Sequence, residues 1–197
     1  MKTIPKYLFF CVVMFFACQT ERLGQNDQSS DNQSDQQDQT SEESCETLFA
    51  RGEDDHATCF LDDGFNRWGW TNGSIEFGDY SFDLYSGAGQ CVLDNGTLAG
   101  TLTVNYDEAT GTVDIDYEMN EGFVLNETHL YVGNEPYPTD QNGQDSVAPG
   151  QFPYQHELDG VEFDSYTVDG LSGPIYIIAH GLVCNDGEAE DDGPLPE

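Results

Sequence analysis

Basic residues are scarce in this chain of 197 residues, in which five lysines and arginines face 38 aspartates and glutamates, a formal net charge of −33 at pH 7. Nucleic acid and anionic membrane surfaces repel such a protein, so the composition excludes nucleic acid as a partner. Divalent cations, neutral glycans and basic proteins remain as partner classes. The alternative is that the carboxylates only keep the surface hydrated.

Sequence motifs for a catalytic nucleophile are also missing. The chain contains no Gly-x-Ser-x-Gly motif, which argues against a hydrolase of the nucleophile-elbow type. No Cys-x-x-Cys spacing occurs, which argues against a zinc site built on cysteines. No window shows the apolar stripe of an amphipathic helix. We therefore predict no catalytic residue and a chain that is not an enzyme.

Long apolar runs are confined to two places, and the first is the N-terminus. Residues 1–17 combine two lysines with the apolar run Leu8–Ala17, which is typical of an export signal and too short to span a bilayer. The following Cys18 completes a sequence similar to a bacterial lipobox, so we predict a lipoprotein signal peptide with Cys18 as the lipid attachment site. The alternative is a plain secretory signal. Loss of residues 1–17 removes two lysines and no acidic residue, which changes the net charge from −33 to −35.

Polar segments flank the central part of the chain. Residues 18–43 contain no large apolar residue after Leu23, and residues 186–197 are rich in Asp, Glu and Pro. Such segments cannot bury enough surface to offset their ordering entropy, so we expect a disordered tether and a disordered acidic tail. One folded domain over residues 44–185 lies between them. An outer-membrane lipoprotein held at the cell surface is expected, or, with a plain signal, a secreted protein.

Four cysteines fall within the predicted domain: Cys45, Cys59, Cys91 and Cys184. An even number in an exported chain predicts two disulfides. Three pairings are possible, and we favour Cys45–Cys59, which closes a short loop, together with Cys91–Cys184.

The second apolar run, Pro174–Cys184, predicts a central strand covered on both faces. Apolar residues alternate over 102–106 and again over 113–119, which is typical of a hairpin. Further short strands and frequent turns predict an all-β domain, an antiparallel β-sandwich with jelly-roll or immunoglobulin-like topology left open. The long connection Gly133–His156 is rich in proline and is expected to be functional or an ordered excursion.

Aromatic residues cluster near Trp68, Trp70 and Tyr85. Sugar rings stack on exposed aromatic faces, so these three residues are candidates for binding a glycan. The alternative is that they pack in the core.

Metal sites have two candidate residue sets. Asp62, Asp63 and Asn66 offer oxygen atoms of the kind that calcium prefers, although their spacing is not that of an EF-hand. The histidines His129, His156 and His180 would form a zinc site if the fold brought them together. That second set gives the alternative of a metal-dependent hydrolase.

Several stretches together resemble a secreted β-domain found in exported proteins of marine bacteria of the Bacteroidetes type. They are Cys59–Gly73, Thr128–Gly133, Pro149–Tyr154 and Ile178–His180. The resemblance implies a surface or secreted setting, and it implies no activity and no site residues. We therefore expect a surface-anchored, non-enzymatic binding or adhesion module for a glycan or protein ligand, with calcium as a possible aid. A structural cell-surface component is the other alternative.

Overall fold

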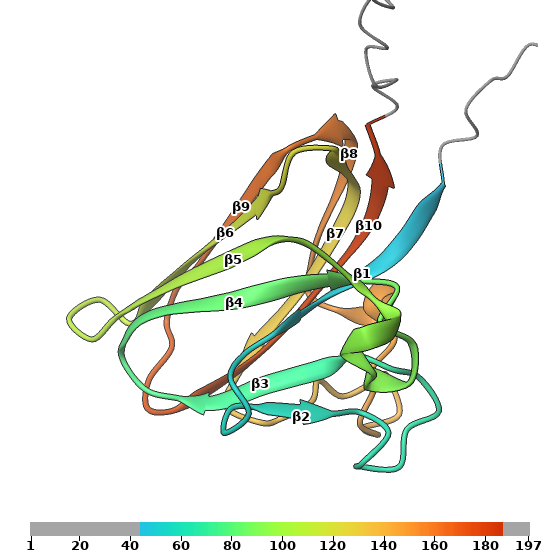
Figure 1. Cartoon of the computed structure of the whole chain (residues 1–197). Coiled ribbons are helices and arrows are strands. Elements are labelled where there is room, and N and C mark those ends of the chain that lie inside the picture. The colour runs from blue at the N-terminus through green and yellow to red at the C-terminus, as the bar shows by residue number, and fades with distance from the viewer. Residues whose placement is uncertain (1–43, 187–197) are drawn as a thin grey trace, which may run out of the picture. The chain divides into compact units, whose positions relative to one another are not determined.

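A computed structural model describes residues 44–186 of the chain (Figure 1). The predicted signal peptide, Cys18, the tether and residues 187–197 of the acidic tail lie outside the described residues. Within the described part, no helix has the length and hydrophobicity needed to cross a membrane.

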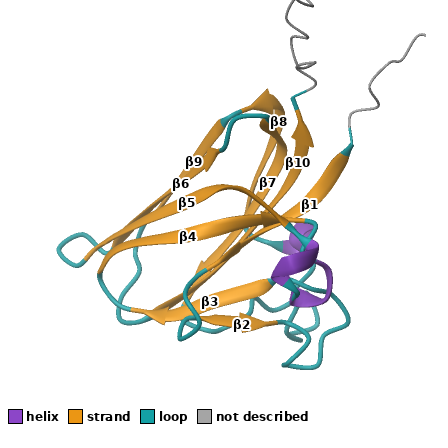
Figure 2. Ribbon diagram, viewed as in Figure 1, coloured by secondary structure: helices purple, strands orange, loops and turns teal. Residues whose placement is uncertain are grey.

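Strands make up almost all of the regular structure (Figure 2). Every pairing between them is antiparallel. The strands are β1 (Cys45–Arg51), β2 (Ala57–Cys59), β3 (Trp70–Ile75), β4 (Gly78–Ser86), β5 (Thr97–Asp107), β6 (Thr112–Met119), β7 (Phe123–Gly133), β8 (Tyr154–Val161), β9 (Phe163–Val168) and β10 (Ile175–Asn185). Within residues 44–186, three short 3-10 turns complete the set: η1 (Gly89–Cys91), η2 (Leu93–Asn95) and η3 (Pro149–Gln151).

Strand β10 is the central strand, as the sequence predicts. It pairs with β7 along its whole length, with β3 near its start and with β1 near its end. The buried Asn72 of β3 lies where β3 and β1 diverge beside β10, and it links the three strands. Its amide nitrogen donates to the carbonyl oxygens of Ala50 on β1 and Ile177 on β10. Its side-chain oxygen accepts from the backbone nitrogen of Gly52 at 2.7 Å.

The sheet folds into two facing layers. One layer contains β8, β7, β10, β3 and β2, and the sheet continues from β10 through β1 into β4, β5, β6 and β9. Strands β8 and β9 do not pair, so the sheet does not close into a barrel. The predicted all-β antiparallel sandwich is confirmed, and the strand order β2-β3-β10-β1-β4-β5-β6-β9 gives the topology that the sequence left open.

Two hydrophobic cores explain why β10 is apolar on both faces. Ile175, Ile177 and Ala179 point into the core between the layers, with the apolar residues of the predicted β5–β6 hairpin. Ile178 points to the outer face, where a second core is covered by loops. That second core contains Phe49, Phe60, Trp70, Ala88, Tyr131, Tyr137, Val147, Phe152 and Ile178.

The long connection between β7 and β8 is an ordered cover for this outer face. It buries Tyr137, Val147 and Phe152 in the second core. The hydroxyl of Thr71 donates to the carbonyl oxygen of Pro136 at 2.7 Å, which fastens the loop to β3. The excursion predicted from the prolines is therefore confirmed as ordered.

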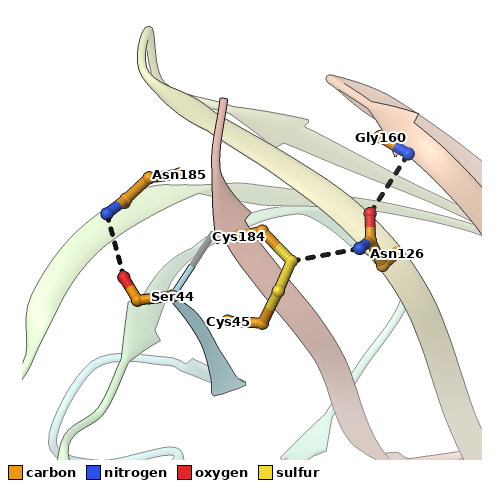
Figure 3. The surroundings of a disulfide bond; sticks show 6 residues. All are labelled: Ser44, Cys45, Asn126, Gly160, Cys184 and Asn185. Atoms are coloured by element: carbon orange, nitrogen blue, oxygen red, sulfur yellow. Dashed lines mark hydrogen bonds between the residues drawn. A yellow bond between two sulfur atoms is a disulfide. The ribbon is translucent and has the colours of Figure 1, made fainter. Parts of the chain in front are cut away.

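The predicted cysteine pairing is wrong. The disulfides are Cys45–Cys184 and Cys59–Cys91. Cys45 and Cys184 are register partners on β1 and β10, so their side chains meet directly although 139 residues separate them (Figure 3). The side chain of Asn126 donates to the sulfur of Cys184 and accepts from the backbone nitrogen of Gly160, so β7 and β8 are joined to this bridge.

Candidate functional site

A hollow of about 330 Å³ opens on the outer face of the β1–β10 sheet. Segments far apart in sequence line it: two strands, the connection before β3, η1 and the long β7–β8 connection. The lining residues are Thr47, Phe49, Asn66, Arg67, Trp68, Gln90, Val147, Pro149 and His180.

Trp68 forms an aromatic wall of this hollow and is only partly buried. Its ring packs edge-on against Phe49, with ring centroids 5.2 Å apart at 72°. Gly69, the residue after Trp68, has a backbone conformation and a close contact that require glycine. Its φ is +139°, and a Cβ at this residue would lie 2.5 Å from the Phe60 ring. The chain therefore turns sharply between the two tryptophans, and Trp68 stays outside the strand.

Trp70 and Tyr85 do not line the hollow. Trp70 begins β3 and is 3% exposed in the second core. Tyr85 packs against it from β4, with ring centroids 6.4 Å apart. Among the three aromatic candidates, only Trp68 lines the hollow, whereas Trp70 packs in the second core.

Polar side chains complete the hollow, and among the residues that the structure describes none of those lining it is a carboxylate. Asn66 and Gln90 present amides, Thr47 presents a hydroxyl, and Arg67 presents the one guanidinium of the lining. The described residues contain one other basic side chain, Arg51, which pairs with Asp54. Amide, hydroxyl and guanidinium groups beside an aromatic wall can bond the hydroxyls of a ligand whose ring lies on that wall.

His180 closes one side of the hollow and contacts His129 on the neighbouring strand. The two residues are register partners, and their Nδ1 atoms lie 3.2 Å apart. Burial, then the neighbouring His129 and Arg67, lowers the pKa of His180 to about 3. Burial also lowers the pKa of His129, against the opposing effect of Glu127. Both imidazoles are therefore neutral at pH 7, and one can donate to the other.

This histidine pair makes folding stability depend on pH. Unfolded His180 binds a proton near pH 6.5, whereas the folded chain excludes it until about pH 3. Stability is therefore fully present above pH 6.5 and is lost as pH falls, by up to about 1.4 kcal/mol per pH unit. We expect His180→Gln to flatten this slope between pH 6 and 4 in urea unfolding. The carboxylates titrate in both proteins, so equal slopes would contradict this assignment.

His156 lies on the opposite face of the sheet from the other two histidines. It pairs with Thr128, the residue before His129, and successive residues of a strand face opposite ways. Its Nδ1 lies 2.9 Å from a carboxylate oxygen of the buried Asp164, and its ring stacks on Tyr166 at 4.3 Å. The structure thus brings together two of the three predicted zinc ligands, while His156 joins β8 to β9.

The calcium candidates line three different hollows. Asp62 faces the one beside Arg51, Asp63 faces another beside Tyr137, and Asn66 faces the Trp68 hollow. The hydroxyl of Tyr137 donates to Asp63 at 2.6 Å. In residues 44–186, no three His, Cys, Asp or Glu side chains are grouped closely enough to hold a metal ion. Calcium binding at Asp62, Asp63 and Asn66 stays a prediction.

Sequence reasoning missed most of the lining. Thr47 and Gln90 carry no local signal, because only the pairing of β1 with β10 and the position of η1 bring them to Trp68. Arg67 did carry one: it is among three arginines in the chain and directly precedes Trp68.

Comparison with known protein families, with curated proteins and with solved structures gives no match.

Proposed function

We propose that this chain is a surface-anchored, non-enzymatic module that binds glycans in the hollow beside Trp68. The observation that carries the proposal is the partly exposed ring of Trp68 in one hollow with the side chains of Asn66, Arg67 and Gln90. A sugar needs an apolar surface for its C–H face and hydrogen-bonding groups for its hydroxyls, and this lining offers both.

The rigidity of the hollow also supports binding. Phe49 holds the Trp68 ring from β1, and the Cys59–Cys91 disulfide joins β2 to η1, which carries Gln90. An aromatic ring held in place by packing loses little conformational entropy when a ligand binds. The volume of about 330 Å³ is at the lower end of the range for small-ligand sites, which fits one or a few sugar rings.

The anchoring part of the proposal comes from the sequence. The lipobox-like segment at Cys18 and the polar residues 18–43 support attachment to an outer membrane, and the two disulfides suit an oxidising compartment.

The test is binding of the purified protein to a panel of neutral, uronate-containing and sulfated polysaccharides by affinity electrophoresis. We expect saturable binding, weakened at least about tenfold by Trp68→Ala, because aromatic anchors dominate such sites. Phe163→Ala is the matched control, since Phe163 is an aromatic side chain 55% exposed on β9 that does not line the hollow.

The panel is measured with calcium and again with a chelator. Loss of binding in chelator would show that calcium is needed for glycan binding. Unchanged binding would assign glycan binding to the Trp68 hollow alone. Equal losses in the Trp68→Ala and Phe163→Ala variants, or no binding to any polysaccharide, would contradict the proposal.

A further inference from the structure

We infer that the ligand of the Trp68 hollow carries an anionic group, a carboxylate or a sulfate on a sugar ring, that pairs with Arg67. This inference rests on the proposed function and narrows its ligand class from glycans in general to glycans with an acidic substituent.

The first observation is that Arg67 is exposed and pairs with no acidic residue of the described part of the chain. The chain has 38 acidic residues, and Arg51, the other basic residue of the described part, does pair with Asp54. Across residues 44–186, no carboxylate oxygen lies within 4.0 Å of Arg67. In so acidic a chain, an unpaired guanidinium is available for an anion from outside.

The second observation is that no carboxylate of residues 44–186 lines this hollow. Asp63, Glu135 and Asp145 line the hollow beside Tyr137, and Glu46 lines another beside β1. The Trp68 hollow instead combines Arg67 with amides, a hydroxyl and a histidine. An anion placed there meets donors and no acidic side chain of the lining.

The third observation is that His180 adds no positive charge to the lining at pH 7. His180 stays neutral at pH 7 because burial lowers its pKa to about 3. Among the described residues, Arg67 is therefore the single positive charge of the lining, and it matches a ligand with one negative charge at this position. Because a guanidinium presents a planar fork of N–H groups, it can bond both oxygens of a carboxylate or two of a sulfate.

The net charge of −33 limits the ligand further. It repels a polyanion at long range, but salt screens this repulsion beyond about 8 Å at physiological ionic strength. A single acidic group on an otherwise neutral oligosaccharide avoids most of the repulsion and keeps the contact with Arg67. We therefore expect a sparsely charged glycan to bind better than a densely charged one.

The experiment uses matched oligosaccharides on glucose and on galactose backbones, each in a neutral form, a form with one terminal uronate and a form with one terminal sulfate. Titration calorimetry on the purified protein at about 0.15 M salt measures each affinity. We expect an acidic form to bind at least about tenfold more tightly than its neutral counterpart. Arg67→Gln should abolish this preference for the acidic form, whereas Arg51→Gln should preserve it.

The outcomes separate this inference from the proposed function. Equal affinity for neutral and acidic forms, or a preference that survives Arg67→Gln, would overturn the anionic ligand and leave glycan binding intact. Binding of the uronate alone would support the inference and assign the group as a carboxylate. Absence of binding to every oligosaccharide and to the polysaccharide panel would overturn both.

Discussion

Replacing Cys45 and Cys184 together with alanine is expected to lower the free energy of unfolding by about 5 kcal/mol. The bridge joins residues 139 apart, so it closes almost the whole described chain. In the chain-entropy model, a cross-link restricts the unfolded chain more strongly as the closed loop lengthens. The Cys59–Cys91 bridge closes a separation of 32 and should contribute about 4 kcal/mol. Denaturant unfolding of the two double variants measures both losses.

The pairing itself can be read from a single substitution. Among the four cysteines of the two bridges, the thiol that the Cys45→Ala substitution frees must be Cys184 if β1 and β10 pair as described. A bridge between Cys45 and Cys59 would instead leave Cys59 free. Alkylation of the unreduced variant followed by peptide mass spectrometry identifies the residue, and label on Cys59 would contradict the pairing.

Trp70→Ala is expected to destabilise the fold by about 3–5 kcal/mol, whereas Trp68→Ala should cost about 1 kcal/mol. Trp70 is 3% exposed and packs between Trp68 and Tyr85, so its removal opens a cavity in the second core. Trp68 keeps part of its ring in solvent, so less packing is lost. Urea unfolding of both variants measures the difference.

Trp70→Phe is the matched variant, since it keeps an aromatic ring in the second core and should recover much of the loss. Similar losses for Trp68→Ala and Trp70→Ala would contradict the division between a ligand-facing ring and a core ring. That outcome would return both tryptophans to the core and remove the aromatic wall from the proposed site.

Much of the fold could be predicted because its signals are local. The apolar run of β10 and the alternation over β5 and β6 follow directly from burial on two faces or on one face. The ordered β7–β8 connection was also visible from its prolines. Strand β3 begins at Trp70, so Trp68 lies outside it although only one residue separates the two tryptophans. The positive φ of Gly69 separates Trp68 from that strand, and the presence of a glycine in the sequence does not predict its φ.

The remaining features depend on register, which no local pattern encodes. Proximity in sequence favoured Cys45–Cys59, but the pairing of β1 with β10 places Cys45 opposite Cys184. Register also determines which histidines lie together, because it places His129 of β7 opposite His180 of β10. His156, paired with the residue before His129, faces the other way. Each outcome follows from which residues face each other across a strand pair.

The position of Trp68 allows a direct test of whether a glycan binds in this hollow. The chain has two tryptophans, so a ¹⁵N-labelled sample has two indole N–H resonances, which Trp68→Phe assigns. Titration with the tightest-binding glycan of the panel should shift the Trp68 resonance in a saturable way and move that of the buried Trp70 less. Binding that leaves the Trp68 resonance unchanged would contradict a glycan site in this hollow.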